Sequence, residues 1–382
     1  MIHYFNPGHE AAVLNGSKYY QAPTNHVRMQ RELAFLPVWY AHPDDFVLVY
    51  EPLPESFLKE IAQLHACELA TTVSMDDLKH LQESDELFQR LVNQAVDIWG
   101  ISPQACHFLT QMSEQHRLDW QIPAWKDVYR TLGGRQTAQT VLSTLIDTIP
   151  EIDKNLLPQF YSNPDEIEQI VAHSACQLVA KAPYSSSGKG LVWLPPGKMA
   201  QSERQILKGM VRKQSAVSLE RALDKQLDFS MHFSINADKQ AVRGLRVTSA
   251  MTVNFIGYSL FQTNAKGAYE KSFLLSQDAI KKRLTEFVSG DLLEKIQCQL
   301  LQIIGQIYAP HYHGNIGVDM LIYLDNNQMR LHPCVEINMR KSMGYLALRL
   351  FERFLSPDFV GEFCVGYHRN EHGYYFQSIK KC

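Results

Sequence analysis

A short loop between two apolar segments contains the residue types that bind phosphate groups. The sequence LVAKAPYSSSGKGLVWL, from Leu178 to Leu194, places Lys181 in an apolar strand that is followed by a loop of small residues. Glycine adopts the unusual dihedral angles of such loops, and successive backbone N–H groups form a concavity that binds anions. Lysine side chains add point charges for phosphate oxygens. We therefore predict a phosphate-binding flap that contains Ser185, Ser186, Ser187, Gly188 and Lys189.

Better-known phosphate motifs do not fit this loop. A P-loop requires a glycine five residues before its Gly-Lys pair and a Ser or Thr after it, whereas this chain has Pro183 and Gly190 at those positions. The dinucleotide-binding fingerprint requires a third glycine and a following helix, but an apolar strand follows here. An ordinary polar hairpin loop is therefore the alternative to a flap.

Two apolar strands further along the chain carry oxygen ligands for a metal ion. The segments GNIGVDMLIYL and LHPCVEINMR flank the turn signal Asp325-Asn326-Asn327. With a two-residue turn at 326–327, Asp319 faces Cys334, and the polar residues beyond it share one face because side chains alternate along strands. Carboxylate and amide oxygens suit Mg²⁺, and the predicted ligands are Asp319, Glu336 and Asn338. The alternative is a hairpin with unrelated polar residues near its open end.

Composition excludes several classes of protein. The chain has 382 residues, 45% of them hydrophobic, and a net charge of −3, so it lacks the basic excess of a nucleic-acid-binding protein. It contains no run of roughly 18 apolar residues and begins with no signal-peptide pattern. Its seven cysteines are scattered and form no C-x-x-C pair, which is typical of reduced thiols. We expect a cytoplasmic protein with neither nucleic-acid nor membrane partners.

The first 125 residues have the pattern of a small α/β domain. Strand-like runs at 2–5, 46–50 and 69–73 alternate with helical periodicity, which favours a parallel sheet. The loop Asn6 to Glu10 follows the first strand, where ligands bind in such sheets, although a capped turn explains it equally well. Residues 76–96 are expected to be helical.

After residue 125 the expected helices and strands follow a different order from that of the first domain. Helices are expected within 128–149, from Pro164 and over 198–212, around the strand that carries Lys181. Mainly antiparallel strands follow between 217 and 262, then an amphipathic helix at 291–309, the acidic hairpin and a closing helix at 343–354. These patterns indicate a second, α+β region.

Taken in order, these features resemble the ATP-grasp superfamily over about residues 126–345. Its pattern begins with a basic residue at a helix start, here Arg135, and continues with the strand lysine and the flap described above. The hinge acid resembles Glu220, the hinge residue whose backbone meets adenine resembles Leu223, and the ribose-binding acid resembles Asp228. The pattern ends with Asp and Glu-x-Asn metal ligands, which match the acidic hairpin.

The resemblance implies an α/β and α+β architecture, namely an ATP-grasp fold with an N-terminal α/β (pre-ATP-grasp-like) domain. It divides the chain into that domain at 1–125, a small subdomain with the flap at 126–225, and a subdomain with the metal site at 226–382. The implied activity is an ATP-dependent ligase: ATP phosphorylates a carboxylate, and an amine displaces phosphate. ATP and Mg²⁺ or Mn²⁺ are the implied cofactors. The implied partners are small carboxylate and amine substrates, with a homodimer as one option for assembly.

One position departs from the family pattern. Many such ligases have an arginine two residues before the metal-binding aspartate, where this chain has Gly317. Arg340, or Arg243 or Arg246 on an earlier strand, could supply the missing catalytic charge. The alternative is an ATP-binding scaffold without ligase activity, such as a kinase, a sensor or an interaction module.

Overall fold

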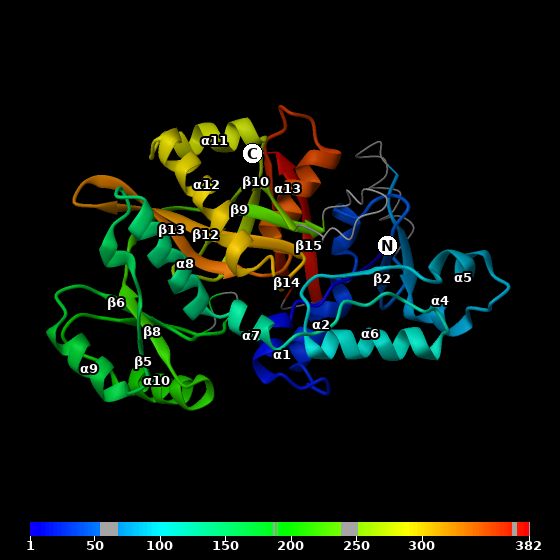
Figure 1. The fold of residues 1–382 in the computed structure, drawn as a ribbon, viewed down its shortest axis with the longest axis horizontal. Helices are drawn as coiled ribbons and strands as arrows, with labels where there is room; N and C mark the ends of the chain where they lie inside the picture. The colour runs from blue at the N-terminus through cyan, green and yellow to red at the C-terminus, as the bar shows by residue number, and fades with distance from the viewer. Residues whose placement is uncertain (54–67, 186–187, 189, 238–250, 369–372, 382) are drawn as a thin grey trace, which may run out of the picture. The chain divides into compact units, whose positions relative to one another are not determined.

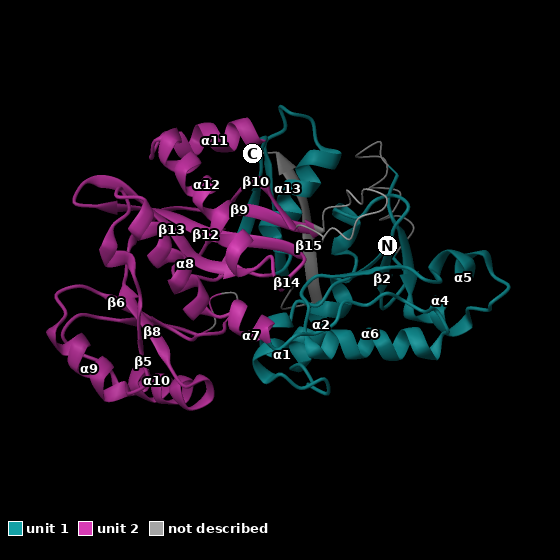
Figure 2. Cartoon of the chain, in the orientation of Figure 1, with its two compact units in different colours: residues 1–127, 271–276, 340–382 teal, residues 128–270, 277–339 magenta. Residues whose placement is uncertain are grey.

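The computed structural model describes the 382 residues except 54–67, 186–187, 189, 238–250, 369–372 and 382 (Figure 1). The chain forms two compact units (Figure 2). Unit 1 contains residues 1–127, 271–276 and 340–382, and unit 2 contains residues 128–270 and 277–339. The predicted division into three consecutive domains stays a prediction. Within the described residues, no helix is both long and apolar enough to cross a membrane.

Unit 1 is built on a parallel sheet, as the alternation of strands and helices predicted. The strand order is β3 (Thr71–Ser74), β2 (Phe46–Val49), β1 (Ile2–Tyr4) and β4 (Val96–Ile98), and all neighbours run parallel. Strands β1 and β2 are fully buried, which is usual when helices cover both faces of a parallel sheet. The helices of this part are α1 (His9–Asn15), α2 (Thr24–Glu32), η1 (Leu36–Trp39), α4 (Met75–His80), α5 (Glu86–Leu91) and α6 (Pro103–Gln115).

The region expected to be one helical stretch is divided. A capping box between Ser74 and Asp77 begins α4, and the chain is extended at Leu81 before α5. Asn93, with a φ of 59°, then turns the chain into β4. The prediction of a helix over 76–96 was therefore wrong at its end, because a three-residue strand is too short to show its own periodicity.

The later segments of unit 1 add a helix and antiparallel strands. Residues 271–274 of β11 (Tyr269–Leu274) belong to this unit, where the end of β11 pairs with β14 (Gly361–His368). Strand β14 in turn pairs with β15 (Gly373–Lys381). Helix α13 (Met343–Phe354) has the predicted bounds. It buries Leu346 and Leu350 in a core cluster that also contains Trp39 and Trp99.

The first part of unit 2 is a layer of helices on a small antiparallel sheet. The sheet order is β5 (Gln159–Tyr161), β8 (Val217–Arg221), β6 (Leu178–Lys181) and β7 (Leu191–Leu194). Ile167 and Val171 of α9 (Pro164–His173) and Leu207 of α10 (Gln201–Gln214) are buried in one cluster with this sheet. The helices α7 (Val128–Leu132), α8 (Arg135–Thr148) and η2 (Lys154–Leu156) precede them.

The second part of unit 2 is a larger antiparallel sheet. Its strands lie in the order β13 (Gln328–Asn338), β12 (Gly314–Asp325), β9 (Asp224–Ala237) and β10 (Met251–Thr263). Helices α11 (Gln277–Thr285) and α12 (Gly290–Ile307) pack on β10, and α8 packs on β13. The α/β and α+β fold class is therefore confirmed, and unit 2 contains the elements in the order that the ATP-grasp resemblance implied.

The acidic hairpin has the predicted turn but a different register. Asn326 and Asn327 have φ values of 48° and 61°, which is the geometry of a two-residue hairpin turn. The regular register ends at a bulge where Met320 lies opposite residues 333–335. Pro333 has no N–H group for the ladder, which explains an irregularity at this point. Asp319 consequently pairs with Glu336, so the prediction that it faces Cys334 was wrong.

Candidate active site

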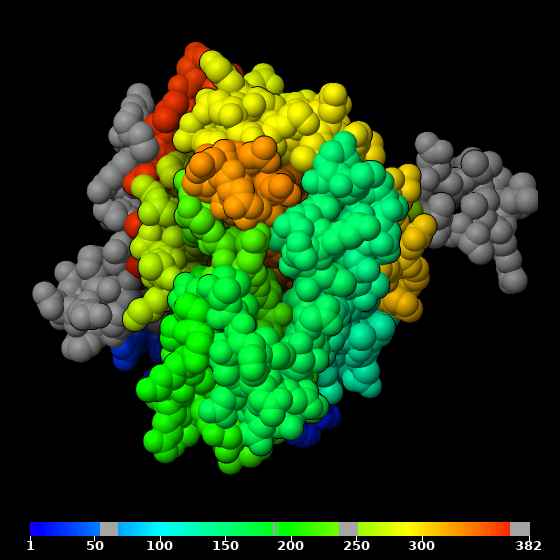
Figure 3. All heavy atoms as spheres, turned by 90° about the vertical axis from the view of Figure 1, so that its left-hand side faces the viewer, coloured from blue at the N-terminus to red at the C-terminus, as the bar shows by residue number. Residues whose placement is uncertain are grey.

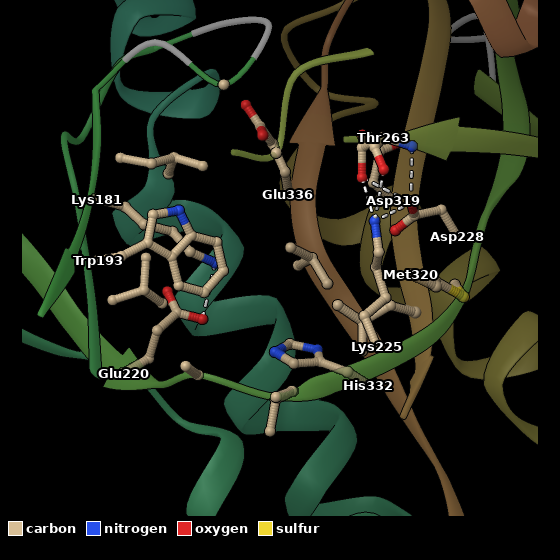
Figure 4. Close-up of a pocket in the computed structure, with 18 of the residues that line it drawn as sticks. Lys181, Trp193, Glu220, Lys225, Asp228, Thr263, Asp319, Met320, His332 and Glu336 are labelled. Atoms are coloured by element: carbon tan, nitrogen blue, oxygen red, sulfur yellow. Dashed lines mark hydrogen bonds and ion pairs between the residues drawn. The ribbon is translucent and has the colours of Figure 1, made fainter. Parts of the chain in front are cut away.

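A cavity of about 340 Å³ in unit 2 brings together residues from both of its sheets (Figure 4). The predicted site residues that line it are Arg135, Lys181, Ser185, Gly188, Glu220, Leu223, Asp228, Asp319 and Glu336. Asn338 is next to them, because its Nδ2 donates a hydrogen bond of 2.9 Å to Asp319 Oδ2. The remaining predicted residues of the flap and two catalytic candidates lie outside the described residues: Ser186, Ser187, Lys189, Arg243 and Arg246.

The strand lysine is buried and paired. Lys181 is 9% exposed, and its Nζ lies 2.9 Å from Glu220 Oε2 on the neighbouring strand β8. Figure 4 shows this pair on one side of the cavity, with Trp193 beside it. A buried charge requires a partner, so Glu220 keeps the ammonium group in place at the cavity wall.

Arg135 links the start of the flap to the acidic hairpin. It is the first residue of α8, and its guanidinium donates to the Ala182 carbonyl oxygen at 3.1 Å through Nε. Its Nη2 lies 2.9 Å from Glu336 Oε2, and its Nη1 donates to the Val335 carbonyl oxygen at 3.4 Å. The planar fork of arginine allows these contacts to form at once.

The two acids of the hairpin lie directly opposite each other on β12 and β13. Like charges in this position destabilise a sheet, and neighbouring groups compensate for them here. Ser230 Oγ donates to Asp319 Oδ1 at 2.6 Å, in addition to the contacts of Asn338 and Arg135 given above. Two adjacent carboxylates with an amide alongside fit the oxygen ligands of Mg²⁺. The described residues contain no cluster of three or more His, Cys, Asp or Glu side chains placed for a metal, so such an ion would need further ligands.

The opposite side of the cavity contains Asp228. Its Oδ2 accepts hydrogen bonds from Lys225 Nζ at 2.6 Å, from Thr263 N at 3.1 Å and from Thr263 Oγ1 at 2.7 Å. The carboxylate is 8% exposed and lines the cavity beside Leu223. Three hydrogen bonds on one oxygen fix the direction of this side chain.

The flap requires glycine at position 188, where its backbone comes close to the loop that contains Ala268. Gly188 has a φ of 72°, and a Cβ atom there would lie 2.7 Å from the backbone nitrogen of Ala268. Gly190 has a φ of 81°. Glycine adopts such angles without the strain of a Cβ atom, so Gly188 allows the flap to approach the loop that follows β10.

Several residues that line the cavity were not predicted as site residues, among them His332 and Trp193. His332 is 3% exposed, and its burial lowers its pKa to about 4, so the imidazole is neutral at pH 7. Trp193 lines the cavity, and its indole N–H is buried without a hydrogen-bond partner among the described residues. His332 stands four residues before Glu336 in an otherwise apolar strand, which is the signal that could have identified it.

The hairpin tip lies on the same face of unit 2 as the small sheet. Figure 3 shows the tip (orange) above residues of the small sheet and its helices (green). Arg221 Nη1 on β8 lies 3.1 Å from Asp325 Oδ1 at the tip, so an ion pair connects the two sheets at the surface.

The other catalytic candidate, Arg340, belongs to unit 1. Its Nε forms an ion pair with Glu10 Oε1, and its Nη1 donates to the Lys341 carbonyl oxygen at 2.9 Å. Both residues of the pair are mostly buried, with side-chain exposures of 18% and 19%. The structure therefore pairs Arg340 with the first turn of α1, which follows the loop after β1.

Comparisons with known proteins give a structural likeness alone. No family model matches the sequence, and no curated protein matches it. The N5-carboxyaminoimidazole synthetase of Staphylococcus aureus, complexed with ADP, is 13% identical, with a TM-score of 0.41 over 96% of this chain and 82% of that chain. The biotin carboxylase domain dimer of the Hydrogenobacter thermophilus 2-oxoglutarate carboxylase, in complex with MgADP and bicarbonate, is 10% identical, with a TM-score of 0.46 over 97% and 75%. The biotin carboxylase of Campylobacter jejuni is also 10% identical, with a TM-score of 0.44 over 97% and 77%. A likeness at this level assigns no function to this chain.

Proposed function

We propose that this chain is an ATP-grasp enzyme: an ATP- and Mg²⁺-dependent ligase that joins a carboxylate to an amine through an acyl phosphate. One observation supports the proposal above the others. Residues between positions 135 and 336, chosen from the sequence for one nucleotide site, line a single cavity of unit 2. A chance set of polar residues would be scattered over the surface.

The cavity residues fit the parts of a nucleotide. Lys181 and the flap would bind the phosphates, because an ammonium group and backbone N–H groups attract phosphate oxygens. The hinge around Leu223 would contact adenine, and Asp228 would accept hydrogen bonds from the ribose. Asp319, Glu336 and Asn338 would hold Mg²⁺, which would neutralise charge on the phosphates.

In this reaction the protein would hold the phosphates in position and supply positive charge around them. Phosphoryl transfer requires little covalent chemistry from the enzyme, so fixed cations around the phosphates are the main requirement. Lys181 and Arg135 are each held by a carboxylate, at 2.9 Å from Glu220 and Glu336 respectively. A nucleotide would meet these cations already oriented, which lowers the cost of reorganising the site.

A second candidate function is a nucleotide-binding scaffold without ligase activity. The observation that favours it is Gly317, which stands where many such ligases have an arginine. A Cβ atom there would lie at ordinary contact distance, 3.4 Å, from the ring of His232. A catalytic cation would therefore have to come from another position, and the candidates chosen from the sequence are Arg340, Arg243 and Arg246.

The first test is calorimetric titration of the protein with Mg²⁺-ATP. We expect binding by the unaltered protein and a loss of at least about tenfold in affinity in Lys181→Ala and Glu336→Gln, because each removes a charged contact. Phosphate release is then measured for pairs of carboxylates and amines. Release that requires both substrates supports the ligase, whereas binding without turnover favours the scaffold. No binding by the unaltered protein would contradict both.

A further inference from the structure

The parallel sheet of unit 1 has a switch point between β1 and β4. From β1 the chain continues to β2 and β3 on one side, and it then returns to place β4 on the other side of β1. In open parallel sheets, ligands bind at such a point, in the crevice beyond the carboxyl ends of the strands. The loops that follow these two strands, residues 5–8 and 99–102, therefore border a candidate binding site, and the name crevice stands below for the region between these two loops.

Hydrogen bonds fix these two loops to each other. Asn6 is 3% exposed, and its Nδ2 donates to the Gly100 carbonyl oxygen at 2.7 Å. Its Oδ1 accepts from the Gly100 N–H at 3.0 Å. A Cβ atom at Gly100 would lie 2.5 Å from two atoms of the His9 ring, so glycine is required for the ring to pack here. The loops thus hold His9 at the crevice.

His9 lacks the hydrogen bonds that a buried imidazole normally makes. Its ring is 7% exposed, and apart from an interaction with the Ile101 backbone, neither Nδ1 nor Nε2 makes a hydrogen bond of standard geometry to any residue that the structure describes. Buried polar atoms are nearly always hydrogen-bonded, so such an exception calls for a missing ligand or water. Burial lowers the pKa of His9 to about 4, despite the nearby Glu10 carboxylate. The ring is consequently neutral at pH 7, with one nitrogen that donates and one that accepts.

The ion pair next to His9, Glu10 with Arg340, places a negative and a positive group side by side. Glu10 follows His9 directly, and its carboxylate is paired with Arg340, as described above. Burial is the largest influence on the pKa of Glu10 and would raise it, but the charge and hydrogen bond of Arg340, the nearby His9 and a backbone hydrogen bond together lower it, so the carboxylate remains charged. A ligand that carries one positive and one negative group, close together, complements this arrangement.

We propose that the crevice at the carboxyl ends of β1 and β4 binds the headgroup of a free α-amino acid. Arg340 binds the carboxylate, Glu10 binds the ammonium group, and the His9 ring hydrogen-bonds to the same headgroup. A simple anion would be repelled by Glu10, and a simple cation by Arg340, so the zwitterion is favoured over both. The role of this amino acid as the amine substrate rests on the proposed ligase function, whereas its binding does not.

The test is a direct binding measurement on the full chain without nucleotide. Each common amino acid is titrated and observed by saturation-transfer NMR and calorimetry. We expect at least one to bind, and its analogues that lack either the ammonium or the carboxylate group to bind at least about tenfold more weakly. Because this comparison uses the unaltered protein, it does not depend on the folding of any variant.

Variants then locate the site. Glu10→Gln, Arg340→Gln and His9→Phe should each weaken binding by about tenfold or more. Arg31→Gln is the matched control, since it breaks an exposed ion pair with Glu51 in the same unit and should leave the affinity unchanged. Circular dichroism checks that each variant is folded, and Arg340→Lys, which keeps the charge, replaces Arg340→Gln if that variant unfolds.

Several results would overturn the proposal. They are the absence of saturable binding by any amino acid, equal binding of the analogue without an ammonium group, and an affinity that the three variants leave unchanged. Lys181→Ala separates this proposal from the ligase function, because it should weaken nucleotide binding by at least about tenfold and leave amino-acid binding intact. Amino-acid binding without nucleotide binding would contradict the ligase alone, and the reverse would contradict this site alone.

Discussion

The cavity of unit 2 and the crevice of unit 1 differ in how their polar side chains are satisfied. In the cavity, the cations Lys181 and Arg135 each have a carboxylate partner at 2.9 Å. In the crevice, neither nitrogen of the His9 ring makes a hydrogen bond of standard geometry to a described residue, although an ion pair lies beside the ring. Charged side chains are therefore paired in both regions, and the buried polar atoms left without a standard hydrogen bond among the described residues are the Trp193 indole N–H in the cavity and both ring nitrogens of His9 in the crevice. Substitutions in each region test this difference.

The largest effect is expected from the buried pair of the cavity. Glu220→Gln leaves the Lys181 ammonium buried without its counter-charge, which should lower the free energy of unfolding by about 3 kcal/mol. Urea denaturation measures this change. The matched control is the double variant Lys181→Met with Glu220→Leu, which removes both charges and should be less destabilised than Glu220→Gln. Equal destabilisation of the two would show that the pair does not stabilise the fold through its charges.

In the crevice, the strongest effect on stability should come from the asparagine that joins the loops. Asn6→Ala leaves the Gly100 N–H and carbonyl groups buried without partners, which should cost about 2 kcal/mol of unfolding free energy. Asn6→Asp keeps the acceptor but places a buried carboxylate oxygen against the Gly100 carbonyl oxygen, so at neutral pH it should be at least as destabilised as Asn6→Ala. Urea denaturation of the three proteins checks this order. An unchanged stability in Asn6→Ala would mean that water replaces both hydrogen bonds.

The flap offers a comparison between two glycines. Gly188→Ala should destabilise the native flap by about 2 kcal/mol, because a left-handed φ and a close backbone contact both oppose a Cβ atom. Gly197 has a φ of 78° with no atom within 4 Å of the added Cβ, so Gly197→Ala isolates the conformational part, about 1 kcal/mol. Both variants are compared with the unaltered protein by their nucleotide affinity and by their free energy of unfolding. If the two variants lost the same unfolding free energy, the contact between the added Cβ atom and Ala268 would not contribute to the destabilisation.

The cavity of unit 2 and the crevice of unit 1 also differ in how much of each could be predicted from the sequence. Lys181 and Glu336 are conspicuous because charged residues are rare in apolar strands, so the cavity residues could be chosen before the structure was known. His332 and Trp193 were missed because histidine and tryptophan in a strand resemble ordinary core residues. The pairing of Asp319 with Glu336 depends on a bulge next to Pro333, and strand alternation alone cannot reveal a bulge.

The crevice could be predicted only in part. The loop after β1 was recognised as a place for function, because its position at a strand end follows from the sequence. Its partner loop could not be recognised, since β4 has three residues and its place beside β1 is a pairing between distant segments. The contacts of Asn6 and His9 with Gly100 join residues more than ninety positions apart, and local sequence patterns carry no information on them.

The smallest effect concerns pH and compares the two regions directly. The pKa values of His9 and His332 are lowered to about 4 in the folded protein, mainly by burial, whereas an unfolded histidine has a pKa of 6.5. Between these values the unfolded state binds more protons, so stability present at neutral pH is lost as the pH falls. Between about pH 7 and about pH 5.5 each histidine should lower the unfolding free energy by about 1 kcal/mol. The pKa of His3 is raised by Asp45 and Asp97 although burial opposes it, so its contribution has the opposite sign and is lost as the pH rises.

Single variants separate these contributions. His332→Phe and His9→Phe should each reduce the loss of stability on acidification, as measured by urea denaturation at the two pH values.

A bound amino acid that hydrogen-bonds to the His9 ring gives a further comparison of the two variants. It should raise the free energy of unfolding of the unaltered protein at both pH values and leave that of His9→Phe nearly unchanged. His332→Phe should keep that response, because its ring lines the cavity of unit 2. A response lost equally in both variants would show that the two histidines do not report on separate sites.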